Sequence, residues 1–359
     1  MTTVPVVLSS RGPTPSSGGA VPTGWIQEMP RSGPLVDTFG RVHDDLRISV
    51  TDRCNLRCTY CMPERGMTFL PTPDLLSFDE VVRVASVARA LGVDAVRLTG
   101  GEPLVRRGLD RLVGRLSDLG FADVSLTTNG MLLAPALPAL VAAGLTRVNV
   151  SCDSLIPERF ATIRRRGDLA TVLAAMDAAE AAGLPPVKVN VVLESGTNDD
   201  EILGFAEFAR STGRIVRFIE FMPLDAQGAW HRGRLVPGAE VVRRIDGRWP
   251  LAAVDQADDH APAERFRFVD GGGEIGVIAS VTQPFCGTCN RLRLTADGAV
   301  RNCLFSDDEL DVRGALRSGE PDEAIERQLR RAVWGKRPGH GIDEPGFLRP
   351  VRSMSMIGG

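Results

Sequence analysis

The most informative stretch of this sequence is Cys54-Asn55-Leu56-Arg57-Cys58-Thr59-Tyr60-Cys61. Its three thiols follow a CxxxCxxC spacing, so one loop can bring Cys54, Cys58 and Cys61 to a single centre. A closed structural zinc site and a [4Fe–4S] cluster both normally take four protein ligands. Three cysteines therefore indicate a metal centre with one coordination position left for another molecule. A zinc site with a distant fourth ligand, and three unrelated thiols, are the alternatives.

Short β-branched runs alternate with helical patterns from residue 46 onwards, which is typical of a parallel sheet built from βα units. The expected strands are Leu46–Val50, Ala95–Thr99, Val124–Thr128, Arg147–Ser151, Val187–Leu193 and Ile215–Phe221. The expected helices are Phe78–Leu91, Leu109–Leu119, Ala136–Ala143, Leu169–Ala182, Glu201–Thr212 and Gly238–Arg244. Six such units are fewer than the eight of a closed barrel. The sequence therefore predicts an α/β fold with a partial (βα)6 barrel of the TIM type, and a doubly wound sheet is the alternative.

Polar segments follow most of these strands. In folds of this kind the reactive groups lie on the loops after the strands, at the C-terminal face of the barrel. The cysteine stretch follows the first expected strand. The segments after other strands are Thr99-Gly100-Gly101-Glu102-Pro103, Thr127-Thr128-Asn129-Gly130, Ser151-Cys152-Asp153-Ser154 and Glu220-Phe221-Met222-Pro223. We therefore expect all of them to meet in one site at that face.

A second cysteine group lies near the C-terminus, with Cys286 and Cys289 in a CxxC pair and Cys303 fourteen residues later. A histidine could complete a zinc site there, yet none of the four lies within a few residues of these thiols. The histidines are His43, His231, His260 and His340. Three thiolates without a nearby fourth ligand favour a second [4Fe–4S] cluster with an open iron. Cys152 belongs to neither group, and we assign it to packing.

Two arginines follow the second group in a stretch with strand character, Arg291-Leu292-Arg293. Alternate residues of a strand share a face, so Arg291 and Arg293 point to one side and Leu292 to the other. Paired guanidinium groups beside a metal centre suit a phosphate chain. The alternative is a solvated strand face.

Composition limits the remaining possibilities. The net charge of -3 argues against a general nucleic-acid-binding surface, and no apolar run approaches the ~20 residues of a membrane span. Seven cysteines, six of them at ligand spacings, in a chain without a secretory signal indicate a cytoplasmic metal-binding protein. We expect a disordered tail at residues 1–36, the barrel at 37–245 and a smaller C-terminal domain at 246–359.

Three motifs carry a resemblance to a known family. Cys54–Cys61 resembles the CxxxCxΦC signature of the radical S-adenosylmethionine (SAM) enzymes, and Gly100-Gly101-Glu102-Pro103 resembles their GGEP motif, which grips the amino group of SAM. The stretch from Pro284 to Leu304 resembles the C-terminal signature of the GTP 3′,8-cyclase family, and the likeness extends from about Phe39 to Gly359. The resemblance implies conversion of GTP to 3′,8-cyclo-7,8-dihydroguanosine 5′-triphosphate, with 5′-deoxyadenosine and methionine as co-products. In that family this is the first step of molybdenum cofactor biosynthesis.

The resemblance also implies roles for individual residues and two [4Fe–4S] clusters. The first cluster would be held by Cys54, Cys58 and Cys61, and the auxiliary cluster of the C-terminal domain by Cys286, Cys289 and Cys303. The residues implied to contact SAM are Tyr60, Gly101, Ser151 and Met222. Those implied to contact GTP are Arg47, Arg97, Thr127, Lys188, Arg291, Leu292 and Arg293. The terminal Gly358-Gly359 would reach into the active site.

The implied partners are the GTP substrate, an electron donor of the flavodoxin or ferredoxin type and, by product hand-over, a downstream cyclic pyranopterin monophosphate synthase. Nucleic acid and membrane are not expected as partners, and a homodimer is left open. Two other functions stay as alternatives. One is a radical SAM enzyme with an auxiliary cluster and a different substrate, and the other is a non-catalytic zinc-binding adaptor.

Overall fold

A twelve-stranded sheet is the frame of the computed structural model, which describes residues 28–255 and 260–358. The strand order is β12-β11-β10-β1-β2-β3-β4-β5-β6-β9-β8-β7. The strands are β1 (Asp45–Ser49), β2 (Ala95–Thr99), β3 (Asp123–Thr128), β4 (Arg147–Ser151), β5 (Lys188–Leu193), β6 (Ile215–Glu220), β7 (Leu251–Ala253), β8 (Glu264–Phe268), β9 (Glu274–Ile278), β10 (Arg291–Leu294), β11 (Ala299–Arg301) and β12 (Leu310–Asp311). The α-helices are α1 (Phe78–Ala90), α2 (Leu109–Asp118), α3 (Leu133–Ala142), α4 (Pro157–Arg164), α5 (Leu169–Ala181), α6 (Ile202–Thr212), α7 (Gly238–Asp246), α8 (Arg313–Arg317), α9 (Asp322–Trp334) and α10 (Met354–Ile357).

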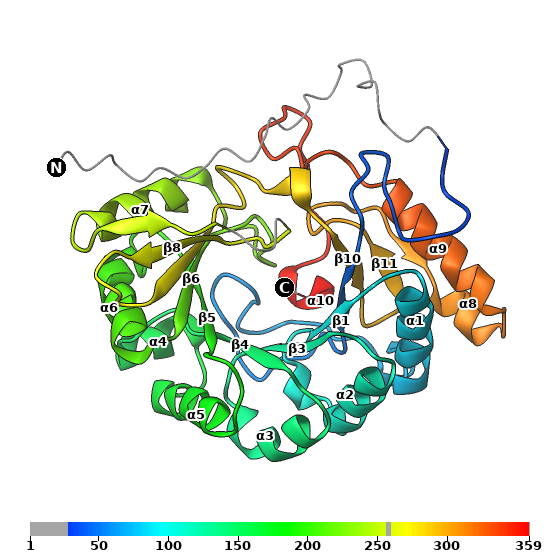
Figure 1. The fold of residues 1–359 in the computed structure, drawn as a ribbon, viewed down its shortest axis with the longest axis horizontal. Coiled ribbons are helices and arrows are strands. Elements are labelled where there is room, and N and C mark those ends of the chain that lie inside the picture. Colours follow the sequence, from blue (N-terminus) through cyan, green and yellow to red (C-terminus); the bar gives the residue numbers. More distant parts are fainter. Residues whose placement is uncertain (1–27, 256–259, 359) are drawn as a thin grey trace.

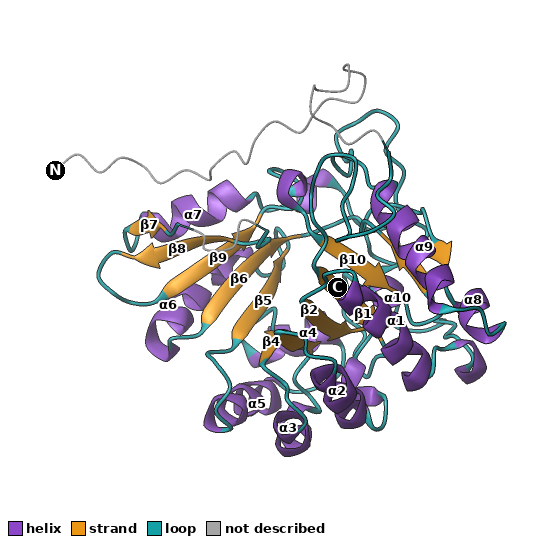
Figure 2. Cartoon of the chain, turned by 45° about the vertical axis from the view of Figure 1, so that its right-hand side comes forward, coloured by secondary structure: helices purple, strands orange, loops and turns teal. Residues whose placement is uncertain are grey.

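The strands curve around a central space and most helices lie on the outer side (Figure 1; Figure 2). Strands β10, β1 to β6 and β9 are parallel neighbours, while β11, β12, β8 and β7 extend the two ends of the sheet in antiparallel pairs. The two end strands, β12 and β7, are not paired with each other. The predicted partial barrel is therefore confirmed. A doubly wound sheet, with helices packed on both faces, does not describe this arrangement.

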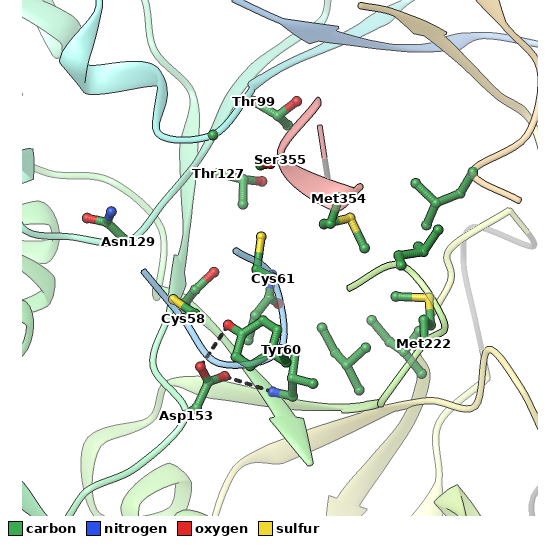
Figure 3. A pocket seen from close by; sticks show the side chains of 18 of the residues that line it. Cys58, Tyr60, Cys61, Thr99, Thr127, Asn129, Asp153, Met222, Met354 and Ser355 are labelled. Carbon is green, nitrogen blue, oxygen red and sulfur yellow. Dashed lines mark hydrogen bonds between the residues drawn. The ribbon is translucent and has the colours of Figure 1, made fainter. Parts of the chain in front are cut away.

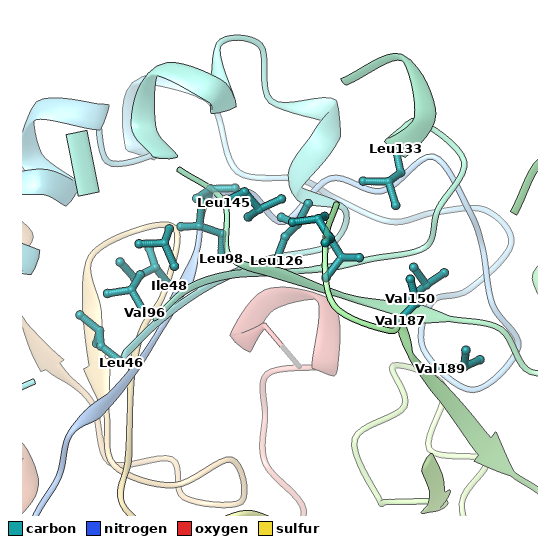
Figure 4. Packing of buried hydrophobic residues seen from close by; sticks show 14 of the residues in the cluster. Leu46, Ile48, Val96, Leu98, Leu126, Leu133, Leu145, Val150, Val187 and Val189 are labelled. Carbon is teal, nitrogen blue, oxygen red and sulfur yellow. The ribbon is translucent and has the colours of Figure 1, made fainter. Parts of the chain in front are cut away.

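Strand alternation separates an apolar outer face from a polar inner face. In β1, Leu46 and Ile48 are fully buried against the helices, and Figure 4 shows them packed with Val96, Leu98 and residues of the next strands. The intervening residue, Arg47, points the other way. The outer helices begin with clear signals, as in α1, where Ser77 and Glu80 form a capping box. The core thus lies between sheet and helices, and the barrel interior remains available for polar side chains.

The C-terminal segment continues the barrel sheet at both ends. We expected the segment after residue 245 to form a separate, smaller domain. Instead β9 pairs with β6, and β10 pairs with β1, both in parallel. The segment after residue 245 thus widens the barrel on both sides. The division at residues 245 and 246 remains a proposal about folding units.

The N-terminal prediction requires a correction. Residues 1–27 of the expected tail lie outside the described residues, but its last part is ordered. Leu35 is buried beneath the end of α1, where its N–H donates to Leu91 O at 3.2 Å and its carbonyl accepts from the N–H of His43. The prediction of disorder as far as residue 36 was therefore wrong, because Leu35 is buried in the hydrophobic core. No helix in the described ranges is long and apolar enough to cross a bilayer.

Candidate active site

A cavity of about 250 Å³ occupies the barrel interior at the C-terminal ends of the strands. Its lining brings together residues from the cysteine loop, from the inner faces of β1 to β6 and β10, and from the C-terminal helix α10. Figure 3 shows Cys58, Tyr60 and Cys61 on one side of it and Met354 and Ser355 of α10 on another. The polar segments expected at this face therefore do meet in one site.

The three thiols of the first group all line this cavity. A tight turn forms the loop, in which Cys61 N–H and Met62 N–H both donate to Cys58 O at 3.0 Å. Burial raises the pKa of the Cys54 thiol to about 11, and the neighbouring Cys58 adds to the shift. Among the described residues no three His, Cys, Asp or Glu side chains stand close enough to hold a single metal ion. A cluster differs because each cysteine binds its own iron, and this donor set of three thiols on one loop fits a cluster with an open position.

The glycines of the GGEP turn lie against the backbone that leads into the cysteine loop. Gly101 N–H donates to Thr51 O at 2.7 Å, and Glu102 N–H donates to Arg53 O at 2.8 Å. A Cβ on Gly101 would lie 2.4 Å from Arg53 O, so only glycine allows this approach. The turn and the cysteine loop are therefore one structural unit.

The Glu102 carboxylate of this turn is buried and accepts hydrogen bonds from Leu104 N–H, Thr128 Oγ1 and Asn129 N–H. Burial raises the pKa of Glu102 to about 7, against the lowering effect of these bonds. The carboxylate thereby ties the loops that follow β2 and β3 together.

The residues that the resemblance assigns to SAM lie on the same cavity. Tyr60, Gly101, Ser151 and Met222 are all part of its lining. The Tyr60 hydroxyl donates to Asp153 Oδ2 at 2.8 Å, as the dashed line in Figure 3 shows. The four positions are therefore within reach of one ligand that also touches the cysteine loop.

A wall of guanidinium groups, from Arg47, Arg97, Arg291 and Arg293, lines the same cavity as the cysteine loop. Arg47 is the register partner of Arg293 on β10 and of Arg97 on β2, and all three line the cavity with Arg291 and Thr127. Burial and the neighbouring arginines hold the pKa of Arg47 well below its usual range, and they lower the pKa of Arg293 to about 10. Within the described residues, Arg47 Nε and the Nε and Nη2 atoms of Arg291 have no hydrogen-bond partner. This wall is suited to a polyanion.

Two residues assigned to GTP, Leu292 and Lys188, are not part of the lining of the cavity itself. The Leu292 side chain is fully buried in the core on the outer face, because its neighbours Arg291 and Arg293 take the inner face. The backbone of Leu292 pairs with β1, so a contact of this residue with GTP stays a prediction about its backbone. Lys188 is the first residue of β5, and the later residues Asn190 and Val192 of this strand line the cavity. Burial and nearby arginines lower the pKa of Lys188 to about 8.

The second cysteine group lies next to the cavity. Cys286 and Cys289 bracket a short 3-10 turn, Cys303 follows β11, and the adjacent Phe285 and Leu304 line the cavity. Burial raises the pKa of Cys286 to about 12, with contributions from the nearby Cys303 and Cys289. The three thiols therefore stand close to one another.

A buried lysine contacts this second group. Lys336 Nζ donates to Cys289 Sγ at 3.1 Å and to Arg291 O at 2.9 Å, and the side chain is almost completely buried. Arg41 supports the same region, since its Nη1 donates to Cys286 O at 2.6 Å. The second cysteine group is thus contacted by two cationic side chains, Arg41 from the N-terminal part of the chain and Lys336 from the C-terminal part.

The C-terminal tail enters the barrel. Figure 1 shows α10 in the central space, and Gly358 O accepts a hydrogen bond from Arg293 Nη1. A Cβ on Gly358, whose φ is +83°, would lie 2.3 Å from Thr99 Oγ1. Gly358 therefore fits where a larger residue would not, while Gly359 lies outside the described residues.

Sequence reasoning gave no role to several residues that line the cavity, among them Arg217, Asp153 and Arg164. Arg217 is on the inner face of β6, where burial and nearby arginines lower its pKa to about 9; strand alternation could have found it. Asp153 stood in a polar segment that we had noted without giving it a role. Arg164 ends α4, a helix that we did not expect.

Comparison with known proteins agrees with this geometry. Residues 48–209 match the Radical SAM superfamily, and residues 214–342 match Molybdenum Cofactor Synthesis C. The chain is 53% identical to a GTP 3',8-cyclase of Streptomyces coelicolor, over 90% of this chain and 96% of that protein. It is 50% identical to GTP 3',8-cyclase 2 of Mycobacterium tuberculosis, over 92% of this chain and 94% of that protein.

Solved structures share the fold at low sequence identity. SuiB of Streptococcus suis bound to S-adenosylmethionine is 14% identical, with a TM-score of 0.55 over 88% of this chain and 68% of that one. Native anSMEcpe with bound AdoMet is 17% identical, with a TM-score of 0.54 over 82% of each chain. The chain belongs to the radical SAM superfamily and, within it, to the GTP 3',8-cyclase family. As a superfamily member it uses SAM and a [4Fe–4S] cluster.

Proposed function

We propose that this protein is a GTP 3′,8-cyclase, which converts GTP to 3′,8-cyclo-7,8-dihydroguanosine 5′-triphosphate in the first step of molybdenum cofactor biosynthesis. One observation supports it most: the guanidinium wall and the three-thiol loop line a single cavity. The names of the curated relatives support the same activity. A polyanionic substrate and a SAM-binding cluster would thus meet inside the barrel.

In this proposal Cys54, Cys58 and Cys61 hold the first cluster. Tyr60, Gly101, Ser151 and Met222 place SAM, which when bound and reduced supplies a 5′-deoxyadenosyl radical and methionine. The protein's own task is to hold the ribose of GTP beside that radical and to exclude water from the cavity. The apolar side chains in the lining, such as Ile219 and Leu224, serve the second purpose.

The triphosphate would be held by Arg47, Arg97, Thr127, Lys188, Arg291 and Arg293. Asp45 supplies a carboxylate to this region, with Oδ2 3.8 Å from Arg47 Nη2, and the surrounding arginines lower its pKa in spite of its burial. Several buried cations around one carboxylate repel one another, so a bound polyanion would relieve the repulsion. We add Arg217 to this set because it lines the same cavity.

The second cluster would be held by Cys286, Cys289 and Cys303, and its open iron would meet the guanine base. The adjacency of these thiols to the cavity supports this assignment. The Gly358-Gly359 tail would act from inside the barrel, and the hydrogen bond from Arg293 to Gly358 O supports a place beside the substrate.

The remaining proposals concern the surroundings of the enzyme. An electron carrier of the flavodoxin or ferredoxin type would reduce the first cluster, and a cyclic pyranopterin monophosphate synthase would take the product. We propose a cytoplasmic location.

An anaerobic incubation of the reconstituted protein with SAM, GTP and dithionite, analysed by LC–MS, tests the function. The proposal predicts 5′-deoxyadenosine together with a new nucleotide isomeric with GTP. Formation of 5′-deoxyadenosine without any change in GTP would instead support a radical SAM enzyme with a different substrate. A protein that binds zinc, stays colourless and ignores SAM would support the adaptor.

A further inference from the structure

Helix α4 supports the cysteine loop through its last turn. Arg57 N–H donates to Arg164 O at 3.2 Å, and Thr59 N–H donates to Ile163 O at 3.0 Å. The last carbonyls of a helix have no partner within the helix, so the loop satisfies groups that would otherwise be orphaned. The stretch between Cys54 and Cys61 is therefore fixed to the end of α4.

The Arg164 side chain continues this contact into the site. It is 2% exposed, and its Nη1 donates to Cys58 Sγ at 3.3 Å. Its Nη2 lies 2.8 Å from Asp153 Oδ2, and its guanidinium carbon lies 6.0 Å from the centre of the Tyr60 ring. Asp153 in turn accepts from the Tyr60 hydroxyl at 2.8 Å and from Val192 N–H at 2.9 Å, as Figure 3 shows for the tyrosine. One buried ion pair therefore contacts two members of the cysteine motif.

Stability alone gives a weak reason for this pair. Desolvating two charges costs several kcal/mol, and well-packed apolar residues in their place are often as stable or more stable. The Asp153 carboxylate accepts hydrogen bonds from the Tyr60 hydroxyl and from Val192 N–H, which orient it and thereby position its ion-pair partner Arg164. What apolar residues could not reproduce is a fixed positive charge at the sulfur of Cys58.

We propose that Arg164 is a positioning residue that raises the reduction potential of the first cluster through its hydrogen bond to Cys58, with Asp153 holding the guanidinium in place. Reduction adds one electron, and hence one negative charge, from a one-electron donor such as dithionite, and no bond is broken in that step. A buried cation beside a ligand sulfur stabilises the added charge, because the surroundings screen it poorly. Hydrogen bonds to the sulfurs are among the factors that set cluster potentials.

The test is an anaerobic redox titration followed by EPR, in which the first cluster is the one whose signal changes when SAM is added. For Arg164→Met, the ratio of reduced to oxidised first cluster at a fixed potential is expected to fall at least tenfold, equivalent to about 59 mV for one electron. Arg164→Lys keeps the charge and should stay within about threefold of the unmodified protein. Asp153→Asn keeps a side-chain oxygen that can accept from Arg164 and hold it in place, but it removes a negative charge, so its ratio should rise.

Opposite shifts from the two members of one ion pair are the signature of an electrostatic role, since a purely structural pair would lose cluster content in both variants alike. Arg159→Met is the matched control, because Arg159 lies on the same helix but pairs with Asp200 and Glu201. If Arg164→Met fails to retain iron, Arg164→Lys and Asp153→Asn decide the question. An unchanged ratio in Asp153→Asn, or an equal shift in Arg159→Met, would overturn the proposal. The inference rests on the first cluster alone, so failure of GTP turnover would not affect it.

Discussion

Arg47 and Arg293 are register partners on the neighbouring parallel strands β1 and β10, although they come from opposite ends of the described chain. Their pairing places two buried arginines next to each other in the lining of the cavity. The fold of the chain between them places β10 next to β1 and so brings these two side chains together.

Replacing Arg293 by Met should weaken GTP binding about ten- to hundred-fold. A hydrogen bond to a charged group contributes ~1.5–3 kcal/mol, and each ~1.4 kcal/mol is a factor of ten in affinity. Isothermal titration calorimetry under anaerobic conditions measures the change, and iron content should remain unchanged. Arg327→Met removes an exposed arginine from the outer helix α9 and serves as the control. Equal affinities in the Arg293 and Arg327 variants would contradict the assignment of the wall to the triphosphate.

Arg47→Met should leave the ligand-free protein at least as stable as before, while it weakens GTP binding. The low pKa of Arg47 reflects burial and repulsion from Arg97 and its other neighbours, so removal of its charge relieves both. Urea unfolding without GTP checks this expectation. A large loss of stability would show that Arg47 is needed mainly as a partner of Asp45.

Lys188 should make the stability of the ligand-free protein depend on pH. Its folded-state pKa of about 8 is below the unfolded value of 10.5, so between these pH values the unfolded chain binds more protons. The free energy of unfolding should therefore rise from pH 8 to pH 10 through this group, and GTP binding that uses its ammonium should weaken over the same range. The matched variant Lys188→Met should lack this contribution in urea titrations. A Lys188→Met curve parallel to that of the unmodified protein would contradict the prediction.

Gly358→Ala should lower product formation at least tenfold while both clusters remain assembled. The added Cβ would lie 2.3 Å from Thr99 Oγ1 and 3.1 Å from Ser49 Cβ, in a backbone conformation with positive φ. LC–MS of the product and iron analysis give the two readouts, and deletion of Gly358-Gly359 should have the same effect. Gly346→Ala, where no atom lies near the added Cβ, is the control. Turnover at the unmodified level in the deletion would remove the tail from the mechanism.

Lys336→Met should weaken the second cluster selectively. The substitution removes the ammonium group, just after α9, that donates a hydrogen bond to Cys289 Sγ. We expect faster loss of the iron of one cluster to a chelator, followed by absorbance, with the SAM-responsive EPR signal retained. Loss of both clusters at equal rates would indicate general unfolding instead.

Much of the barrel could be predicted from the sequence, because β-branched runs and terminal glycines mark its strands and helices locally. Of the six predicted strands, β2 and β4 have the predicted bounds, β3, β5 and β6 differ by one residue at one end, and β1 differs by one residue at both ends. Helix α4 was missed because it is only eight residues long and buries few apolar side chains, chiefly Phe160 and Ile163. Arg164 was missed with it.

The C-terminal arrangement could not be predicted for a different reason. The pairing of β10 with β1 joins segments far apart in sequence, and no local pattern specifies which strand edge a later strand will meet. The two groups of three cysteines could be recognised from their spacing in the sequence. That Arg47, Arg97 and Arg293 lie side by side on neighbouring strands follows only from the strand pairing.

The most direct test of the central claim is to follow one hydrogen atom. With GTP that carries deuterium at the ribose C3′ position, the proposed placement of substrate and SAM predicts transfer of one deuterium to 5′-deoxyadenosine, detected by mass spectrometry. In the Arg293→Met variant, which should bind GTP more weakly, deuterium transfer at a subsaturating GTP concentration should be lower than in the unmodified protein. Formation of 5′-deoxyadenosine without deuterium, at full turnover and with saturating GTP, would contradict the account.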